Sequence, residues 1–264
     1  MLMDTLFKLN NVSSGYGTKV VLKSLSFEIR EGEFFGIIGP NGSGKTTLLK
    51  TMTHVLNPVS GTVLFRGTDI PQIDSRTLAR DIAFVPQETL SAFSFNVMEI
   101  VLMGRYPHIS RFEMETKRDY NIAKNALKTV TCLHLASEDL DEISAGERQR
   151  VMIAKALAQE PNVLMLDEPT SRLDIGHQIE IFDIIKRLNR ERGITVIAVL
   201  HDLNLAADYC DRLLLLDSGS VFKIGSVDEI LTYQNIEQVY KTVVLVKDSP
   251  ATKKPHVILV PKYQ

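Results

Sequence analysis

Apolar and polar side chains alternate near the start of the chain. Between residues 6 and 30, apolar positions recur with a period of about two on both sides of Gly15 and Gly17. That period belongs to strands with one buried face, so the stretch predicts two antiparallel strands joined by a turn. Phe34–Ile38 is apolar throughout, which is typical of a short strand buried on both faces.

Strands and helices are expected to alternate along the rest of the chain. Predicted strands lie at 61–66, 82–85, 163–166, 195–200 and 213–216, and predicted helices at 45–55, 96–104, 118–135 and 179–188. This alternation predicts an α/β fold with a mainly parallel core sheet that follows an antiparallel N-terminal β subdomain. We expect a single domain over 1–264, with an inserted helical subdomain at about 88–158 and a C-terminal hairpin at about 241–264.

Composition narrows the class of protein. Of 264 residues, 44% are hydrophobic and 23% charged, and 30 basic against 32 acidic side chains leave a net charge of −2. A protein that binds nucleic acid through its phosphates normally carries a basic excess, so no nucleic-acid partner is expected. Cys132 and Cys210 lie far apart and indicate neither a disulfide framework nor a zinc knuckle.

The chain also lacks the sequence signals of secretion or membrane insertion. Its N-terminus has no basic segment followed by an apolar one, so no signal peptide is expected. The longest apolar runs are far below the ~20 residues that span a bilayer. We therefore expect a cytosolic chain that can dock on a membrane protein without crossing the membrane.

A glycine-rich stretch separates the strand at 34–38 from the next predicted helix. It matches the phosphate-loop pattern G-x-x-x-x-G-K-[ST]. Glycines let successive N–H groups point at one anion, and the helix N-terminus adds positive potential. Lys45 can reach the β- and γ-phosphates of a nucleotide, and Thr46 can ligate Mg²⁺. The expected nucleotide-binding residues are Gly39, Pro40, Asn41, Gly42, Ser43, Gly44, Lys45, Thr46 and Thr47.

A second buried strand, at 163–166, ends in two acidic residues. Parallel sheets hold their ligands at the carboxyl ends of the strands, where Asp167 and Glu168 are expected to lie. Asp167 would hold Mg²⁺, and Glu168 would orient the attacking water as a general base. A strand followed by a polar turn would look the same in isolation, but the phosphate loop upstream favours the catalytic interpretation.

Further segments carry a family resemblance. The stretch Ile-Ser-Ala-Gly-Glu-Arg-Gln-Arg at 143–150 resembles the signature motif of ATP-binding cassette (ABC) ATPases, commonly written LSGGQ or LSGGE. Residues 169–174 resemble the D-loop of that family. Gln87 stands at the Q-loop, Tyr16 at the aromatic A-loop position and His201 at the switch histidine. The resemblance covers about residues 5–225.

The resemblance implies an ATPase that uses ATP and Mg²⁺ and forms a head-to-tail homodimer. Each ATP would lie between the phosphate loop of one subunit and the signature of the other. Tyr16 would stack on adenine, and His201 would hydrogen-bond the γ-phosphate. Gln87 would ligate Mg²⁺ or the attacking water, and Asp174 would act across the dimer. The implied signature contacts are Ser144, Ala145, Gly146 and Glu147, and the implied Mg²⁺ ligands are Thr46, Gln87 and Asp167.

Two positions depart from the family pattern. Ala145 replaces the usual first glycine of the signature, and its methyl group is tolerable only where the backbone φ is negative. Arg172 is bulkier than the usual D-loop residue. Neither change removes a group with a catalytic role.

Two short stretches point to a cargo. The stretch from Ile100 to His108, which ends in Gly-Arg-Tyr-Pro-His, is similar to the VxxGRxPH stretch of importers of iron–siderophores, haem and vitamin B12. Residues 247–258 resemble the C-terminal hairpin of that subfamily. The first stretch also fits a simpler interpretation, a helix ended by Gly-Arg-Tyr-Pro.

The resemblance implies the ATP-hydrolysing subunit, a translocase, of a metal-chelate importer that lies peripherally on the cytoplasmic face of the cell membrane. Its partners would be separate permease subunits, a second copy of itself and, indirectly, a periplasmic or surface substrate-binding protein. Two other hypotheses stay open: an importer ATPase for another substrate such as a metal ion, and a non-transport ABC ATPase. A catalytically inactive scaffold is disfavoured by Lys45, Glu168 and His201.

Overall fold

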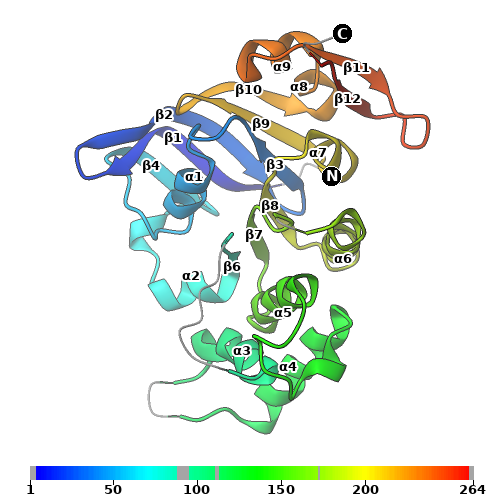
Figure 1. Cartoon of the computed structure of the whole chain (residues 1–264). Helices are drawn as coiled ribbons and strands as arrows, with labels where there is room; N and C mark the ends of the chain where they lie inside the picture. Colours follow the sequence, from blue (N-terminus) through cyan, green and yellow to red (C-terminus); the bar gives the residue numbers. More distant parts are fainter. Residues whose placement is uncertain (1–3, 88–94, 111–112, 172, 262–264) are drawn as a thin grey trace. The chain divides into compact units, whose positions relative to one another are not determined.

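The computed structural model describes residues 4–87, 95–110, 113–171 and 173–261. The chain divides into two compact units, Met1–Gln72 together with Thr195–Gln264, and Ile73–Ile194 (Figure 1). Within the described ranges, no helix combines the length and the apolar composition that crossing a bilayer requires.

An antiparallel sheet begins the first unit. Its strands are β1 (Thr5–Tyr16), β2 (Lys19–Arg30), β4 (Ser60–Phe65) and β5 (Thr68–Asp69), in the order β2-β1-β4-β5. Gly17 adopts a φ of 57° in the tight turn between β1 and β2, where Tyr16 pairs with Lys19. Cross-strand contacts such as Phe7 on Phe65, with ring centroids 5.0 Å apart, close the apolar face.

The core strands of the first unit follow the predicted α/β pattern. They are β3 (Phe34–Ile38), β8 (Thr195–Val199), β9 (Arg212–Asp217) and β10 (Ser220–Ser226). β3 lies between β8 and β9 and is parallel to both, and every residue of β3 and β8 is buried. β10 adds an antiparallel edge beside β9, which the sequence did not indicate because its side chains are only partly buried.

Short helices and a hairpin complete this unit. They are α1 (Lys45–Met52), the 3₁₀ turn η1 (Ile70–Gln72), α7 (Leu203–Tyr209), α8 (Val227–Ile230), α9 (Tyr233–Tyr240), β11 (Val244–Asp248) and β12 (Pro255–Leu259). The end of α7 reaches β3 at Gly36. A β-carbon there would lie 2.7 Å from Cys210 Sγ and 2.5 Å from Leu213 Cδ2, so the close approach requires glycine.

The second unit is mostly helical. Its elements are α2 (Ser75–Asp81), β6 (Ile82–Val85), α3 (Val97–Leu102), η2 (Met103–His108), α4 (Lys117–Thr129), η3 (Leu133–Leu135), α5 (Ala145–Ala158), β7 (Val163–Asp167) and α6 (Ile175–Arg192). β6 and β7 pair in parallel, and α3, α4 and α5 pack on one another (Figure 1). In α6 the buried Ile181, Ile185 and Leu188 form the expected amphipathic stripe.

The expected fold class is confirmed, and one predicted helix is shorter than its pattern. The apolar periodicity at 118–135 predicts one helix, but α4 ends at Thr129. Thr131 adopts a left-handed φ of 58°, and the Cys132 N–H donates back to the Leu127 carbonyl at 2.9 Å. This bond closes the helix end in the manner of a Schellman motif, normally formed around glycine.

Candidate functional site

The phosphate loop joins β3 to α1 in the first unit. At Gly39, with a φ of 148°, a β-carbon would collide with the Leu216 carbonyl oxygen, so only glycine fits. Gly42 and Gly44 also have positive φ values, 78° and 103°. The Ser43 carbonyl accepts from the Gly219 N–H at 3.1 Å, which ties the loop to the turn between β9 and β10. The loop conformation is therefore set by glycine and by neighbouring backbone.

The N-terminus of α1 lacks a side-chain cap. Gly44 is its N-cap and has no side chain that could accept from the first-turn amides, and the first turn contains no acidic residue. Each of the other α-helices in the described ranges begins at an Asp, Asn, Ser or Thr whose side chain accepts such a bond. Uncapped first-turn amides and the helix dipole favour an anion at this end.

Two side chains of the loop add polar hydrogens beside that helix end. Lys45 is 5% exposed, and its ammonium donates to the carbonyls of Gly39 at 2.8 Å and Pro40 at 3.1 Å. The Ser43 hydroxyl is buried with no hydrogen-bond partner among the described residues. A buried hydroxyl without a partner is costly, and a ligand rich in acceptor oxygens would satisfy it. The loop therefore fits a phosphate group.

The remaining loop residues lie at different depths. Thr47 is buried at 6% exposure and Thr46 is half-buried, whereas Asn41 and Gly42 are exposed and Pro40 is half-buried. These depths place the threonines on the helix side and the Asn41–Gly42 turn on the solvent side of the loop.

Tyr16 and His201 belong to the same unit as the phosphate loop. Tyr16 ends β1 with 48% of its surface exposed, which leaves its ring accessible for stacking. His201 is exposed and follows β8 directly before Asp202, the N-cap of α7. Because His201 is bonded directly to the residue that caps α7, its backbone position depends on that of the helix.

The acidic pair ends β7 in the second unit. Asp167 is 2% exposed, and Glu168 is half-buried with a φ of 52°. A residue other than glycine held in this left-handed region stores on the order of 1–3 kcal/mol of strain, which is common at functional sites. The Gln87 amide donates to Glu168 Oε2 at 2.5 Å, so the structure brings together the two side chains expected to act on the attacking water.

The signature residues begin α5, also in the second unit. Ser144 is its N-cap and forms a capping box with Glu147, whose carboxylate accepts from the Ser144 hydroxyl at 2.6 Å and from its N–H at 3.0 Å. The hydrogen bond from the Ser144 hydroxyl is the main cause that lowers the pKa of Glu147. Ala145 is exposed in the first helical turn and is not among the residues with positive φ, so its methyl group is tolerated.

His177 is a residue that the motif analysis missed. Its backbone N–H donates to Asp174 Oδ1 at 2.9 Å, and its Nδ1 lies 2.8 Å from Asp174 Oδ2. A β-carbon at the buried Gly146 would lie 2.5 Å from the His177 ring, so this ring sits against the signature backbone. One histidine thus connects the D-loop aspartate to the signature. The sequence signal that could have indicated His177 is its position three residues after Asp174, the aspartate that caps α6. Arg172, the other unusual D-loop position, lies outside the described residues.

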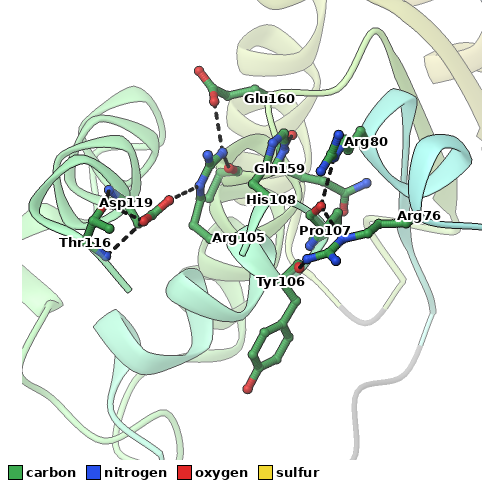
Figure 2. A network of polar contacts seen from close by, with 11 residues as sticks. Arg76, Arg80, Arg105, Tyr106, Pro107, His108, Thr116, Asp119, Gln159 and Glu160 are labelled. Carbon is green, nitrogen blue, oxygen red and sulfur yellow. Dashed lines mark hydrogen bonds and ion pairs between the residues drawn. The ribbon is translucent and has the colours of Figure 1, made fainter. Parts of the chain in front are cut away.

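The Gly-Arg-Tyr-Pro-His stretch forms a buried joint in the second unit (Figure 2). Arg105 is 3% exposed and donates to Asp119 Oδ1 at 3.0 Å, to the Ala158 carbonyl at 2.6 Å and to Glu160 Oε2 at 2.9 Å. His108 Nε2 lies 2.8 Å from the Gln159 carbonyl. Arg105 and His108 therefore cover the carbonyls that end the signature helix α5.

Side chains of α2 and α5 close the joint from the other side (Figure 2). Arg76 and Arg80 both donate to the Pro107 carbonyl at 2.9 Å. The Gln159 amide donates to the carbonyls of Ala79 and Ile82, at the junction of α2 and β6. Because β6 leads to Gln87, these bonds connect the C-terminus of the signature helix to the strand that precedes the Q-loop.

Known proteins are similar to this chain in sequence and in fold. The family profile described as "ABC transporter" matches residues 22–171. The ferric enterobactin transport ATP-binding protein FepC of Escherichia coli (strain K12) is 40% identical over 244 residues, 92% of this chain and 90% of that protein. A chain of a transporter described as metal-chelate type, in an inward-facing conformation, superposes with a TM-score of 0.87 at 29% identity, covering 98% of this chain and 99% of that chain. The dimeric ATP-binding cassette MJ0796, in a post-hydrolysis state bound to ADP and Pi, gives a TM-score of 0.73 at 31% identity over 84% of this chain and 99% of that chain.

The Arg105 joint predicts an acid-sensitive contribution to stability. Hydrogen bonds from Thr116, then the Arg105 guanidinium, lower the pKa of Asp119 from 3.8 to about 2. A lowered carboxylate pKa stabilises the fold above the unfolded value of 3.8 and loses that effect as pH falls toward 2. We expect Asp119→Asn to lower the free energy of unfolding at pH 7 by about 1–2 kcal/mol in urea titrations.

The matched control is Asp139→Asn, an exposed acid of the same unit. It should leave the unfolding midpoint near that of the wild type at pH 7. The difference between the two variants should shrink as the titrations are repeated from pH 5 down to pH 2. Equal destabilisation by both variants, or a difference that does not depend on pH, would contradict the assignment of the effect to the Asp119 carboxylate.

Proposed function

Because the chain belongs to the ABC transporter family, we propose that it couples MgATP binding and hydrolysis to the import of a metal chelate, with the site residues in the roles set out below. The observation that carries the proposal is the phosphate loop, whose uncapped helix N-terminus, buried Lys45 and unpartnered Ser43 hydroxyl fit a nucleotide phosphate. The chain is an ATPase of the ABC type, and what it moves is the finer part of the proposal.

ATP would be bound mainly through its phosphates. The amides of Gly42–Thr47 and the Lys45 ammonium would surround the β- and γ-phosphates, with the ammonium exchanging its present carbonyl partners for phosphate oxygens. Tyr16, half exposed at the end of β1, would stack on the adenine ring. Such stacking needs no hydrogen bonds to the base, so the phosphates would supply most of the affinity.

Thr46, Asp167 and Gln87 are proposed to hold Mg²⁺. A hydroxyl, a carboxylate and an amide oxygen form the hard donor set that this ion prefers. The ion, when bound, supplies neutralisation of charge on the phosphate oxygens. Asp167 is 2% exposed at the end of β7, a position that would keep its carboxylate fixed.

Glu168 is the proposed general base for hydrolysis. A water oxygen would attack the γ-phosphorus, the bond to the β–γ bridging oxygen would break, and Glu168 would accept the proton of the water. Gln87 already donates to the Glu168 carboxylate and would orient it, while His201 would hydrogen-bond the γ-phosphate. Glu168 holds a left-handed backbone conformation, which is common at functional sites and supports a dedicated role.

A second copy of the chain would complete each site. Ser144, Ala145, Gly146 and Glu147 start α5 at an exposed helix N-terminus, which suits a γ-phosphate presented by a partner subunit. Asp174, fixed by His177, would act across the same dimer interface. The dimeric form of the related cassette with ADP and Pi supports this arrangement.

The cargo is proposed to be a metal chelate of the iron–siderophore, haem or cobalamin class. The support is the similarity to a ferric enterobactin transport ATP-binding protein and to a transporter described as metal-chelate type, over nearly the whole chain. Separate permease subunits would receive the motion of the cassette dimer, a substrate-binding protein would deliver the chelate, and this subunit would lie peripherally on the cytoplasmic face of the membrane.

Glu168→Gln should abolish turnover while MgATP binding persists, because the amide keeps the shape and the hydrogen bonding but cannot take a proton. We expect kcat to fall at least about 100-fold, measured by phosphate release, with the Kd for ATP nearly unchanged.

Lys45→Ala should instead weaken ATP binding itself, because the positive charge on the phosphates is lost. Glu191→Gln and Lys50→Ala, in α6 and α1, are the matched controls. Normal hydrolysis by Glu168→Gln would refute the general-base role, and unchanged ATP affinity in Lys45→Ala would refute the phosphate site.

The cargo proposal predicts which loaded binding protein stimulates hydrolysis. With the chain reconstituted with its permease subunits in liposomes, ATPase activity should rise when the binding protein carries a ferric siderophore, haem or cobalamin. The same binding protein exposed to free metal ions serves as the control. Stimulation by free metal ions alone would favour an importer of metal ions and contradict the chelate proposal.

Ala145 provides a test of the shared site. Ala145→Gly should be mild, since it costs up to about 1 kcal/mol of helix stability. Ala145→Asp should block hydrolysis and ATP-driven dimerisation by charge repulsion against the partner's phosphates, without changing ATP binding to the monomer. A dimer of one Ala145→Asp subunit with one Lys45→Ala subunit should keep one intact site. If the Ala145→Asp monomer loses ATP affinity as strongly as Lys45→Ala, the signature acts within its own subunit and the shared site is wrong.

A further inference from the structure

The C-terminal hairpin has no role in the chemistry described so far. β11 and β12 pair antiparallel, with Leu245 opposite Ile258, and follow α9 in the first unit. β12 lies against α7, the short helix that begins two residues after His201 (Figure 1). Polar bonds join the hairpin to both ends of α7.

Asn204 makes the contact near the start of α7. Its Oδ1 accepts from the Val257 N–H at 2.8 Å, and its Nδ2 donates to the Val257 carbonyl at 3.3 Å. Val257 is 6% exposed, so this side chain replaces water for both backbone groups of one strand residue. Such a paired contact fixes the distance and the rotation between the strand and the helix.

The hairpin turn holds the other end of α7. The Lys254 ammonium donates to the carbonyls of Ala207 at 2.8 Å and Asp208 at 3.0 Å. The Thr252 hydroxyl donates to Asp208 Oδ1 at 3.0 Å. Carbonyls in the last turn of a helix have no partner within the helix, and a lysine at this place also suits the negative end of the helix dipole.

The helix between these contacts, α7, has seven residues and is too short to be stable in water without tertiary contacts. Its start is closed by Asp202, which accepts from the Asn204 N–H at 2.7 Å and the Leu205 N–H at 3.1 Å. Because Asp202 directly follows His201, a displacement of α7 would move the backbone of the histidine.

The same C-terminal segment reaches the phosphate loop through Tyr240. This residue ends α9, and its hydroxyl is closed off from solvent with no hydrogen-bond partner of good geometry among the described residues. Burial raises the pKa of Tyr240 to about 12. The backbone of Gly39, the first residue of the loop, lies beside the hydroxyl and lowers this pKa. One segment therefore contacts α7 and also lies beside the first residue of the phosphate loop.

We propose that the segment from α9 to β12 is a positioning element of the ATPase site, in which Thr252, Lys254 and the Val257 backbone hold α7 so that His201 stays in register with the phosphate loop. The proposal rests on the role given to His201 under the proposed function. Lys254 and Asn204 are positioning residues, because they act through α7 and contact no reacting group. Loss of their bonds lets the histidine move while leaving the phosphate loop able to bind ATP.

Lys254→Met tests the proposal, because methionine keeps much of the side-chain volume and removes the two bonds to α7. We expect kcat for ATP hydrolysis to fall about tenfold, with the Kd for ATP, measured in the Glu168→Gln background, within about twofold of its parent. Lys253→Met, at the exposed neighbouring position, should behave as the wild type. Lys254→Arg should restore most of the turnover, because a guanidinium can donate to the same carbonyls.

Hydrogen exchange gives a second readout that a general loss of stability would not reproduce. In Lys254→Met, the amides of 205–210 should exchange faster while those of α1 keep their protection. Asn204→Ser, which removes the bonds at the other end of α7, should lower kcat in the same way and serves as the second variant should Lys254→Met fold poorly.

The outcomes separate this proposal from the proposed function. If His201→Ala is inactive but Lys254→Met and Asn204→Ser hydrolyse ATP like Lys253→Met, the positioning role is overturned and the ATPase assignment stands. If His201→Ala keeps full turnover, the histidine role fails and the positioning proposal fails with it. A fall in ATP affinity equal to the fall in kcat would also overturn it, because the hairpin would then act on the binding loop as a whole.

Discussion

The uncapped N-terminus of α1 is the feature on which the rest of the structure depends. Left-handed glycines curl the loop so that backbone N–H groups, the Ser43 hydroxyl and the Lys45 ammonium gather at one helix end. Donors gathered in this way repel one another and are costly to bury, so the surrounding protein must hold them in place. β3, buried along its whole length, and the bond from Gly219 to Ser43 supply that support. Binding of an anion offsets the free-energy cost of gathering these donors, and a triphosphate has acceptor oxygens that match them.

A second group of residues, which we propose to act in hydrolysis, has its geometry set within the other unit. β7 delivers Asp167 and Glu168, and the strained backbone of Glu168 turns its carboxylate toward the Gln87 amide. His177 connects Asp174 with the backbone of the signature. Each of these arrangements is internal to one unit, so the folding of that unit holds these side chains in place. Such preorganisation is how phosphate-loop ATPases gain most of their rate.

The stretch that resembles metal-chelate importers has a structural role in this chain. Arg105 and His108 cover the last carbonyls of the signature helix, and Arg76 and Arg80 bind the same stretch from α2 (Figure 2). The simpler interpretation of the sequence holds, because the stretch follows the end of α3. The stretch also connects the end of α5 to α2. Within this stretch Tyr106 faces solvent, with 62% of its surface exposed, whereas Arg105 is 3% exposed.

The sequence by itself determined the parts whose physics is local. Period-two alternation predicts β1 and β2, continuous apolar runs predict β3, β7 and β8, and the glycine spacing of 39–44 predicts the phosphate loop, because each depends on neighbouring residues only. The tertiary structure decided the rest. No local pattern shows that Thr131 would end α4, that His177 would lie against Gly146, or that Lys254 would cover carbonyls of a helix 46 residues earlier in the chain. The end of α4 is set within residues 127–132, but a threonine stands where glycine is the usual stop signal. The contacts of His177 and Lys254 join residues distant in sequence, and they form only where packing brings the two segments together.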